Sequence, residues 1–479
     1  MISNIVGLAA GLEISKMLGV KMAPGPGQAN WIAAAYPLTQ GTFVLVSGRL
    51  GAVYGHKNVL LWGGAWFVVW SVVNGFVGQF TPFIIVRALS GIGGALMMPN
   101  VVALIAITCP PGKLRNLSLG FFSASGPTGG WLGALIAGAF VGGGQGRMGM
   151  KWLFFTLAIM AAVVLGALWI LLPQEKPVDR QGKIDWIGAV LGTSGLISST
   201  SSRLVKTLRN SPHNIFNPTP CSLRHLGVQI HKQPHPPTRH MARASFLPLF
   251  IASLLCFMSN GTLLWYMVAW QQLIRHWSVL DFAIGWTPFG IMGTIGAVLS
   301  AYLIPRLAAQ WILAIGALSI LVSNLLLATM PAQQSYWAQV FPATVLMAFC
   351  PDFVYTAAQI IASNSVRRRH QGVAASLIGT LNLYGNSLGL GFAGTVETEV
   401  SAGSGSGGGG VQGYRAALYF GAAIAAVALL VDITFVRMKR DEREGWEDEG
   451  DREGEGEGGI DSVGRGTSTA VVSRNAAAR

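Results

Sequence analysis

Runs of about 20 apolar residues recur along this chain, and they constrain its fold more than any other feature. A helix of about 20 residues is long enough to cross the hydrocarbon core of a bilayer, which is ~30 Å thick. The chain offers little surface to water, since 51% of its 479 residues are hydrophobic and 11% are charged. An average soluble domain has about 25% charged residues. The sequence therefore predicts an all-α polytopic membrane protein.

The apolar runs fall into two sets of six, which predicts two six-helix bundles. Glu13 and Lys16 interrupt the first run, which is the weakest of the twelve. A further apolar segment at 184–198 begins like another span and then loses its hydrophobicity. The twelve predicted spans cover residues 2–20, 30–50, 58–78, 82–108, 116–142, 151–172, 246–270, 281–305, 309–330, 336–363, 371–396 and 414–437.

Basic residues follow every even-numbered span. Lys57 comes after the second span, Arg367, Arg368 and Arg369 after the tenth, and Lys439 after the twelfth. Cytoplasmic loops of membrane proteins carry an excess of Lys and Arg, so the even loops and both termini are predicted to be cytoplasmic. The net charge of +13 thus orients the chain in the membrane, and we expect no nucleic-acid partner.

The same pattern predicts four parts of the chain. Residues 1–175 form an N-terminal six-helix bundle, and residues 246–437 form a C-terminal one. Residues 176–245 are a central cytoplasmic linker that contains the partial helix at 184–198, and residues 438–479 are a disordered cytoplasmic tail.

The central segment at 197–244 has three interpretations. Five of the eight histidines of the chain lie here, which suggests metal binding, but their spacing is irregular and no acid or cysteine pair accompanies them. A disordered linker is favoured because the segment is polar and rich in proline. The third interpretation is translated non-coding or frame-shifted sequence. The four cysteines lack C-x-x-C spacing, which indicates neither a disulfide framework nor a zinc site.

Four stretches carry a family resemblance. "SGRLGAVYGHKNVL" (47–60) resembles the signature loop of the major facilitator superfamily, and "RALSGIGGALMMPN" (87–100) resembles its span-four motif. "GPTGG" (126–130) is similar to the antiporter motif of span five, and 363–397 is similar to the late spans of the fungal fourteen-span drug:proton antiporters. Gly48, Leu50, Gly55 and Lys57 match the signature pattern, and Arg49 belongs to the same candidate loop; the antiporter motif supplies Gly126, Pro127 and Gly130.

The chain departs from this family pattern at three points. Ala52 stands where the signature loop has an aspartate, an acid that in the family helps to lock helices in one state of the transport cycle. Trp131 stands where the antiporter motif has a second glycine. The segment at 184–198 is a remnant of the subfamily's central helix pair, whose second member is missing.

Two charged residues inside spans are candidates for proton coupling. The resemblance assigns this role to Arg87; the alternative is a structural arginine bonded to backbone carbonyls. Asp352 lies near the middle of span ten, where a carboxyl group is costly and usually functional. Its alternative role is to cap a helix broken near Pro351.

Four aromatic residues are candidates for lining a substrate cavity: Trp265, Tyr266, Trp270 and Tyr384. An interfacial aromatic belt explains the first three equally well. Glu397 and Glu399 follow the eleventh span and are expected to be solvated at an outer helix end.

The leading functional hypothesis is a secondary transporter that exports small organic molecules in exchange for protons. The proton gradient supplies the energy, so no cofactor or metal is expected, and the chain has no G-x-x-x-x-G-K-[ST] nucleotide motif. The expected partners are substrate, protons and the lipid bilayer, with a monomer in the plasma membrane rather than the vacuolar membrane. No enzymatic activity is expected. The alternatives are proton-coupled uptake and a non-transporting sensor or scaffold, which the missing acid at Ala52 favours.

Overall fold

A computed structural model describes most of the chain. The described residues are 1–19, 30–110, 112–142, 146–172, 175, 239–304, 306–364, 371–403 and 411–436. They form helices joined by turns, with no strand in any of these ranges. The predicted linker before residue 239, with its partial helix, and the predicted tail lie outside the described residues, and the domain boundaries stay a prediction.

The N-terminal half contributes seven helices to the described residues. The first predicted span, 2–20, is two short helices instead of one, because the backbone leaves helical geometry at Ala10 (φ −102°, ψ 0°). With eight and seven residues, neither is long enough to cross a bilayer alone. The helices are α1 (Ile2–Ala9), α2 (Gly11–Met17), α3 (Asn30–Tyr54), α4 (His56–Phe76), α5 (Phe80–Thr108), α6 (Lys113–Val141) and α7 (Gly146–Leu171).

The C-terminal half begins inside the range predicted as linker, since its first described helix starts at Arg239. The predicted eighth span is divided at Trp286, and its first part begins with a capping box in which Ser278 and Asp281 bond each other's backbone N–H. The elements are α10 (Arg239–Ala269), the π-helical segment Trp270–Ile274, α11 (Val279–Gly285), α12 (Thr287–Leu303), α13 (Ala309–Ala328), α14 (Val340–Asn364), α15 (Gln371–Gly403) and α16 (Val411–Phe435).

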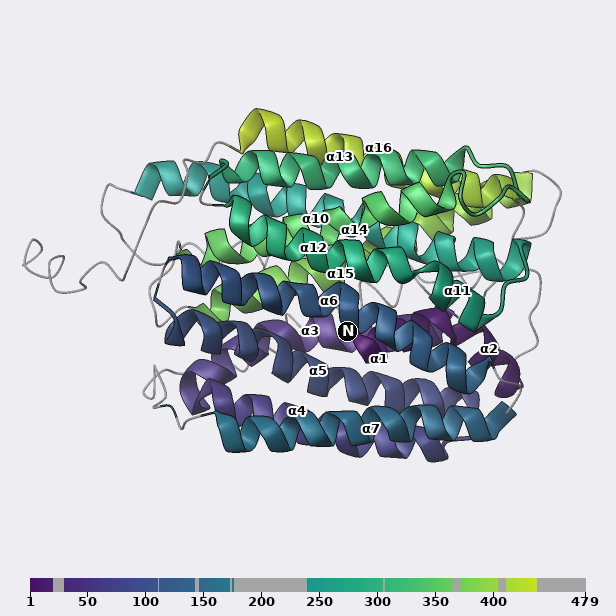
Figure 1. Ribbon diagram of the computed structural model, residues 1–479, viewed down its shortest axis with the longest axis horizontal. Coiled ribbons are helices and arrows are strands. Elements are labelled where there is room, and N and C mark those ends of the chain that lie inside the picture. Colours follow the sequence, from purple (N-terminus) through teal and green to yellow (C-terminus); the bar gives the residue numbers. More distant parts are fainter. Residues whose placement is uncertain are drawn as a thin grey trace, which may run out of the picture.

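The two halves lie side by side with their helices roughly parallel, the N-terminal half purple to blue and the C-terminal half teal to yellow (Figure 1). They meet along α6 and α12, and along α3 and α15. Glycine, serine and threonine are frequent in α3, α6 and α15, which suits helices that must approach one another closely. These two helix pairs form the seams between the halves.

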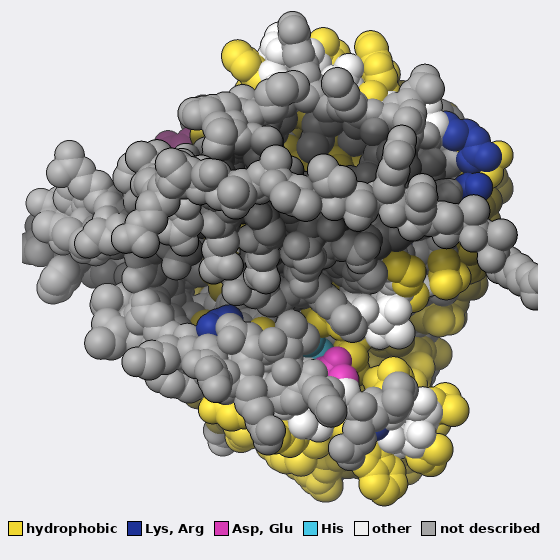
Figure 2. All heavy atoms as spheres, turned by 90° about the vertical axis from the view of Figure 1, so that its left-hand side faces the viewer, with side chains coloured by type: hydrophobic (Ala, Val, Ile, Leu, Met, Phe, Trp, Pro, Cys, Tyr) yellow, Lys and Arg dark blue, Asp and Glu magenta, His cyan; other side chains and the backbone are white. Residues whose placement is uncertain are grey.

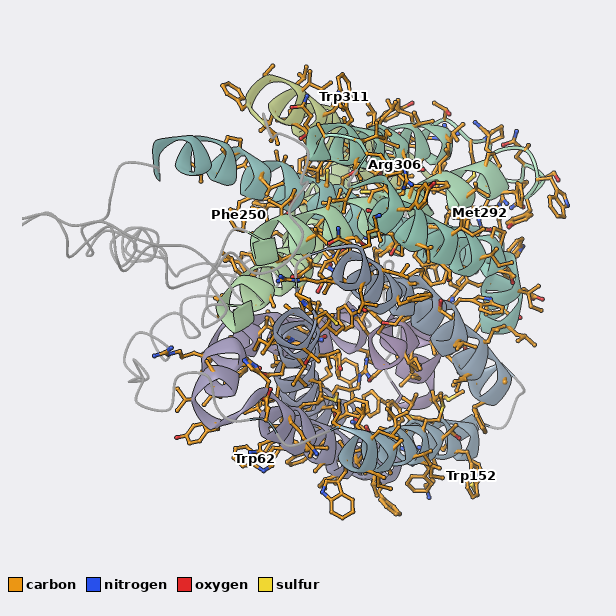
Figure 3. All side chains as sticks on the ribbon, turned by 60° about the vertical axis from the view of Figure 1, so that its left-hand side comes forward. Trp62, Trp152, Phe250, Met292, Arg306 and Trp311 are labelled. Carbon is orange, nitrogen blue, oxygen red and sulfur yellow. The ribbon has the colours of Figure 1, made fainter. Side chains whose placement is uncertain are left out.

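The outer surface fits a lipid environment. Eight helical segments of the described residues are long and apolar enough to cross a membrane. Trp62, Trp152 and Trp311 point away from the helices (Figure 3) and are 59%, 51% and 53% exposed. Where described residues reach the surface in Figure 2, hydrophobic side chains predominate. The chain is therefore an all-α, multi-pass membrane protein, as the apolar runs predicted.

Single cysteines would test the predicted orientation. We expect a cysteine at Arg306, in an even loop, to react with a membrane-impermeant maleimide only after the membrane is permeabilised. A cysteine at Gln333, in an odd loop, should react in intact cells. Both side chains are exposed, and both variants would carry serine at the four native cysteines. Labelling of the Arg306 position in intact cells would overturn the orientation.

Candidate functional site

The seam between α6 and α12 is built from small residues that face bulky ones. A methyl group built on Gly293 would lie 2.4 Å from Pro127 Cβ, and one built on Gly290 would lie 2.8 Å from Trp131 Cβ. Contacts under 3.0 Å are closer than carbon atoms tolerate, so both glycines are required by the packing. The predicted close helix contact at the antiporter-like motif is therefore present at Pro127.

Two hydrogen bonds cross the same seam. The hydroxyls of Thr128 and Thr294 are 2.7 Å apart. Trp131 Nε1 donates to Thr287 Oγ1 at 3.2 Å. The tryptophan that replaces the second glycine of the motif thus has both space, beside Gly290, and a polar partner.

The other two motif glycines face the start of the chain. A methyl group on Gly130 would lie 3.3 Å from Ile5 Cγ1, and one on Gly126 would lie 3.9 Å from the terminal methyl of Met1. The first distance is slightly tight and the second is an ordinary contact. An alanine at Gly126 or Gly130 would therefore disturb the packing of α1 on α6 less than an alanine at Gly293 would disturb the α6–α12 seam.

Asp352 reaches this seam from α14. Its side chain is 3% exposed, and Oδ2 has no hydrogen-bond partner among the described residues. A methyl group on Gly293 would lie 2.9 Å from that oxygen, so the carboxyl group and Pro127 approach the same glycine. Helix α14 runs unbroken through Pro351, so Asp352 does not cap a broken helix. Two features that lie 225 residues apart in the sequence (Pro127 and Asp352) meet here.

Arg87 lies elsewhere, inside the N-terminal half. It is 1% exposed and donates to Ser3 Oγ and to the Ser3 carbonyl, both at 3.0 Å. Its guanidinium carbon lies 5.4 Å from the ring centre of Tyr36 and 5.9 Å from that of Phe154, within cation–π range. Arg87 therefore ties α1 to α5 and forms no ion pair with Asp352, and its coupling role stays a prediction.

The signature-loop residues form the ends of two helices instead of a loop. Gly48, Arg49 and Leu50 belong to the last turns of α3, and Gly55 alone separates α3 from α4. Gly55 has φ +92°, a backbone conformation that favours glycine. The turn is therefore one residue long, which brings Lys57 into the first turn of α4.

Lys57 and Glu175 join α4 to the end of α7. Lys57 Nζ donates to the carbonyls of Trp169 (3.3 Å) and Leu172, which lie at the C-terminus of α7, where a cation is favourable. Glu175 Oε1 accepts a hydrogen bond from the Lys57 backbone N–H at 2.9 Å, at the N-terminus of α4. Ala52 is buried, with 1% exposure. The carboxylate of Glu175 thus lies next to the signature residues, although Glu175 follows α7 in the chain. The sequence pattern did not predict this contact.

Loss of this contact should destabilise the N-terminal half. We expect Glu175→Ala to lower the free energy of unfolding by about 1 kcal/mol, the usual cost of losing a helix N-terminal cap, and Glu175→Gln to cost less because it keeps an acceptor oxygen. Thermal unfolding of the purified protein would measure both. Glu399→Gln, at an exposed position, is the control. An unchanged midpoint in Glu175→Ala would show that the contact contributes no stability.

The four aromatic candidates do not form one group: Tyr266 and Trp270 both pack near Tyr414, whereas Tyr384 lies on another helix. Trp265, Tyr266 and Trp270 are at most 2% exposed, so they are not an interfacial belt, which would face lipid headgroups. Tyr384 lies half-buried on α15, at the seam with α3, where its backbone nitrogen is 3.7 Å from a methyl group built on Gly41. A cavity role for these residues stays a prediction.

Glu397 was expected in solvent, and the structure corrects this. Its side chain is 8% exposed, and its Oε2 accepts a hydrogen bond from Tyr266 Oη at 2.6 Å. The helix α15 continues to Gly403, beyond the predicted end at 396, and so carries Glu397 into the packed interior. Glu399 is exposed, as expected.

Comparison with known proteins gives consistent results. The model of the Major Facilitator Superfamily matches residues 1–390. An uncharacterized MFS-type transporter of Schizosaccharomyces pombe is 33% identical over 442 residues, covering 88% of this chain and 82% of the relative. A low affinity ammonium transporter of Saccharomyces cerevisiae is 30% identical over 85% of this chain and 81% of its own length. The multidrug transporter mdr3 of Aspergillus fumigatus is 31% identical over 88% of this chain and 74% of its own length.

Solved structures share the fold. The human organic anion transporter MFSD10 superposes with a TM-score of 0.63 at 12% identity, covering 90% of this chain and 96% of its own. At that identity the likeness extends to the architecture alone.

Proposed function

The chain belongs to the Major Facilitator Superfamily, and we propose that this transporter exports small organic molecules in exchange for protons. The observation that carries the proposal is the buried carboxyl group of Asp352, which faces Pro127 of the antiporter-like motif across Gly293. Transporters built from two such halves work by moving one half against the other around a site near the membrane midplane. A carboxyl group at the seam between the halves is placed to respond to that movement.

Burial decides the protonation of such a group. A carboxylate without a cation in the membrane interior is costly, and the group becomes neutral by binding a proton. When the halves separate along the α6–α12 seam, water reaches the carboxyl group and the proton is released. Protonation would then alternate with seam opening, which is the coupling that an exchanger requires.

The nature of the cargo rests on the relatives. A multidrug transporter among them supports organic molecules, and we assign the chain to the fungal fourteen-span drug:proton antiporter group by the motifs quoted above. The proposal places a single chain in the plasma membrane, with the proton gradient as its energy source. Ammonium is a second candidate cargo, since a low affinity ammonium transporter is also among the relatives.

Reconstituted protein would test the proposal. Purified full-length protein in liposomes with an imposed pH gradient should show proton flux that depends on an added lipophilic fluorescent dye, with dye moving against the proton flow. Dye moving with the protons would indicate uptake. Flux on addition of ammonium chloride that exceeds the flux in protein-free liposomes, which neutral ammonia causes by crossing the bilayer, would favour the second cargo. Absence of flux with either probe would support a sensor or scaffold.

A further inference from the structure

A second buried carboxyl group lies away from the α6–α12 seam, at the end of α15 that the charge pattern places outside. We propose that Glu397 is a proton-binding site of its own, with Tyr266 as the residue that positions its carboxyl group. Glu397 lies six residues before the end of α15 at Gly403. Proton binding at this position does not depend on the proposed export function; only its role in coupling does.

Three helices enclose the group. Tyr266 of α10 donates its hydroxyl proton to Glu397 Oε2 at 2.6 Å. Tyr414 of α16 packs edge-on against Tyr266, with ring centres 5.5 Å apart, and Trp270 lies 6.3 Å from Tyr414. All three rings are about 1% exposed. Within the described part of the chain, one hydrogen bond thus holds the carboxyl group in an aromatic, water-poor environment.

A second hydroxyl lies beside the same carboxyl group. Ser401, one helical turn further along α15, is 2% exposed, and its Oγ has no hydrogen-bond partner among the described residues. A methyl group built on Gly413 would lie 2.3 Å from Ser401 Oγ and 3.2 Å from Glu397 Cγ. Both side chains therefore occupy the space that the missing side chain of Gly413 leaves, and Ser401 offers an acceptor for an acid proton.

No cation compensates the charge of Glu397 in the described structure. Its titratable neighbours are Tyr266 from α10 and Tyr414 from α16, and on its own helix Glu399 is exposed. Arg415, the next residue after Tyr414, donates instead to the Met330 carbonyl at 2.9 Å. Residues 404–410, which connect α15 to α16 in the sequence, are serine and glycine only.

The other helices packed on α15 contribute no compensating charge either. Four titratable groups of α3, α5 and α14 have contacts of their own: Tyr36 lies at Arg87, Arg87 is bonded to Ser3, Asp352 faces Gly293, and Tyr355 accepts from Gln359. The others are Arg49 and Tyr54, in the last turns of α3 at the end that the charge pattern places inside, and the neutral thiol Cys350 of α14. A buried carboxylate without a cation becomes neutral by binding a proton, so the proton is the ligand that this environment fits.

The backbone next to Tyr266 has a feature that is typical of functional sites. The π-helical segment Trp270–Ile274 begins one turn after Tyr266, and π-helical turns are frequent at functional sites. Within it, Trp270 Nε1 and both polar side-chain atoms of Gln271 are buried without a hydrogen-bond partner among the described residues. Polar groups in this state are ready to bond a water molecule that enters from the outer face.

Infrared difference spectroscopy would test the site directly. Full-length protein in lipid nanodiscs, compared between acidic and alkaline pH, should show a carboxylic-acid C=O band that Glu397→Gln removes and Glu399→Gln retains. The experiment is done in a background that carries both Asp352→Asn and Asp432→Asn, so that the other two acids in the spans that are buried among the described residues do not contribute. An unchanged band in a folded Glu397→Gln protein would overturn the proposal.

A second variant keeps the proposal testable if Glu397→Gln does not fold. Tyr266→Phe retains the acid but removes the bond that stabilises the carboxylate, so the band should persist and its titration midpoint should move to higher pH. An unmoved midpoint would contradict the assigned pairing. In the dye-dependent flux assay, with Asp352 intact, Glu397→Gln should lose pH-driven transport while Glu399→Gln keeps it. Wild-type protein without flux would refute the export function and leave the infrared result to decide on proton binding.

Discussion

Asp352→Asn is expected to abolish dye-dependent proton flux while leaving a folded protein in the membrane. Asparagine has nearly the same size and shape as aspartate but cannot exchange a proton, so the variant keeps the packing at Gly293 and loses the coupling. Stability should change little, because Oδ2 has no hydrogen-bond partner to lose among the described residues and the amide, like the protonated acid, is uncharged. Flux in liposomes and the midpoint of thermal unfolding would measure the two effects separately.

Asp432→Asn is the matched control for this prediction. Asp432 lies in α16, is 1% exposed, and neither of its carboxylate oxygens has a hydrogen-bond partner among the described residues. It therefore shares the burial of Asp352, but its helix packs against α10, α13 and α15, away from the α6–α12 seam. We expect Asp432→Asn to keep its flux. Full flux in Asp352→Asn would return that residue to a structural role.

The sequence was sufficient to predict the helices but not how their polar residues meet. Apolar runs of about 20 residues can cross a bilayer only as helices or as strands of a closed barrel, because backbone groups in lipid must be bonded internally. Pro127 and Asp352 were each recognised, one by its motif and one by its place inside a span. Their approach at Gly293 depends on how α6, α12 and α14 pack, and no local pattern reports that.

Two residues were misread or missed for the same reason. Glu397 was placed in solvent because hydropathy falls at residue 396, whereas packing against α10 and α16 continues the helix and buries the side chain. Glu175 was missed because its partner, the backbone N–H of Lys57, lies 118 residues away. In both cases tertiary contact decides the role of an acidic residue whose own neighbourhood is polar.

Gly293→Ala should reduce transport by forcing the seam apart. The added methyl group would lie 2.4 Å from Pro127 Cβ and 2.9 Å from Asp352 Oδ2, so α12 must move away from α6 or the carboxyl group must turn. Overpacking of this kind typically costs about 1–3 kcal/mol. Alanine is favoured over glycine in a helix by about 1 kcal/mol, which offsets part of that cost. The remainder shifts the population toward states in which the seam is open, and we expect flux to fall several-fold.

Gly391→Ala and Gly166→Ala separate this effect from a general effect of alanine. A methyl group at either position meets no atom within 4 Å, so these variants gain helix propensity without overpacking. Both should keep wild-type flux and an equal or higher unfolding midpoint, whereas Gly293→Ala should lose flux and become more reactive at a cysteine placed at Thr294 on the same seam. Equal flux in all three variants would mean that the α6–α12 seam moves freely with an extra methyl group, and the close contact at Pro127 would then have no part in transport.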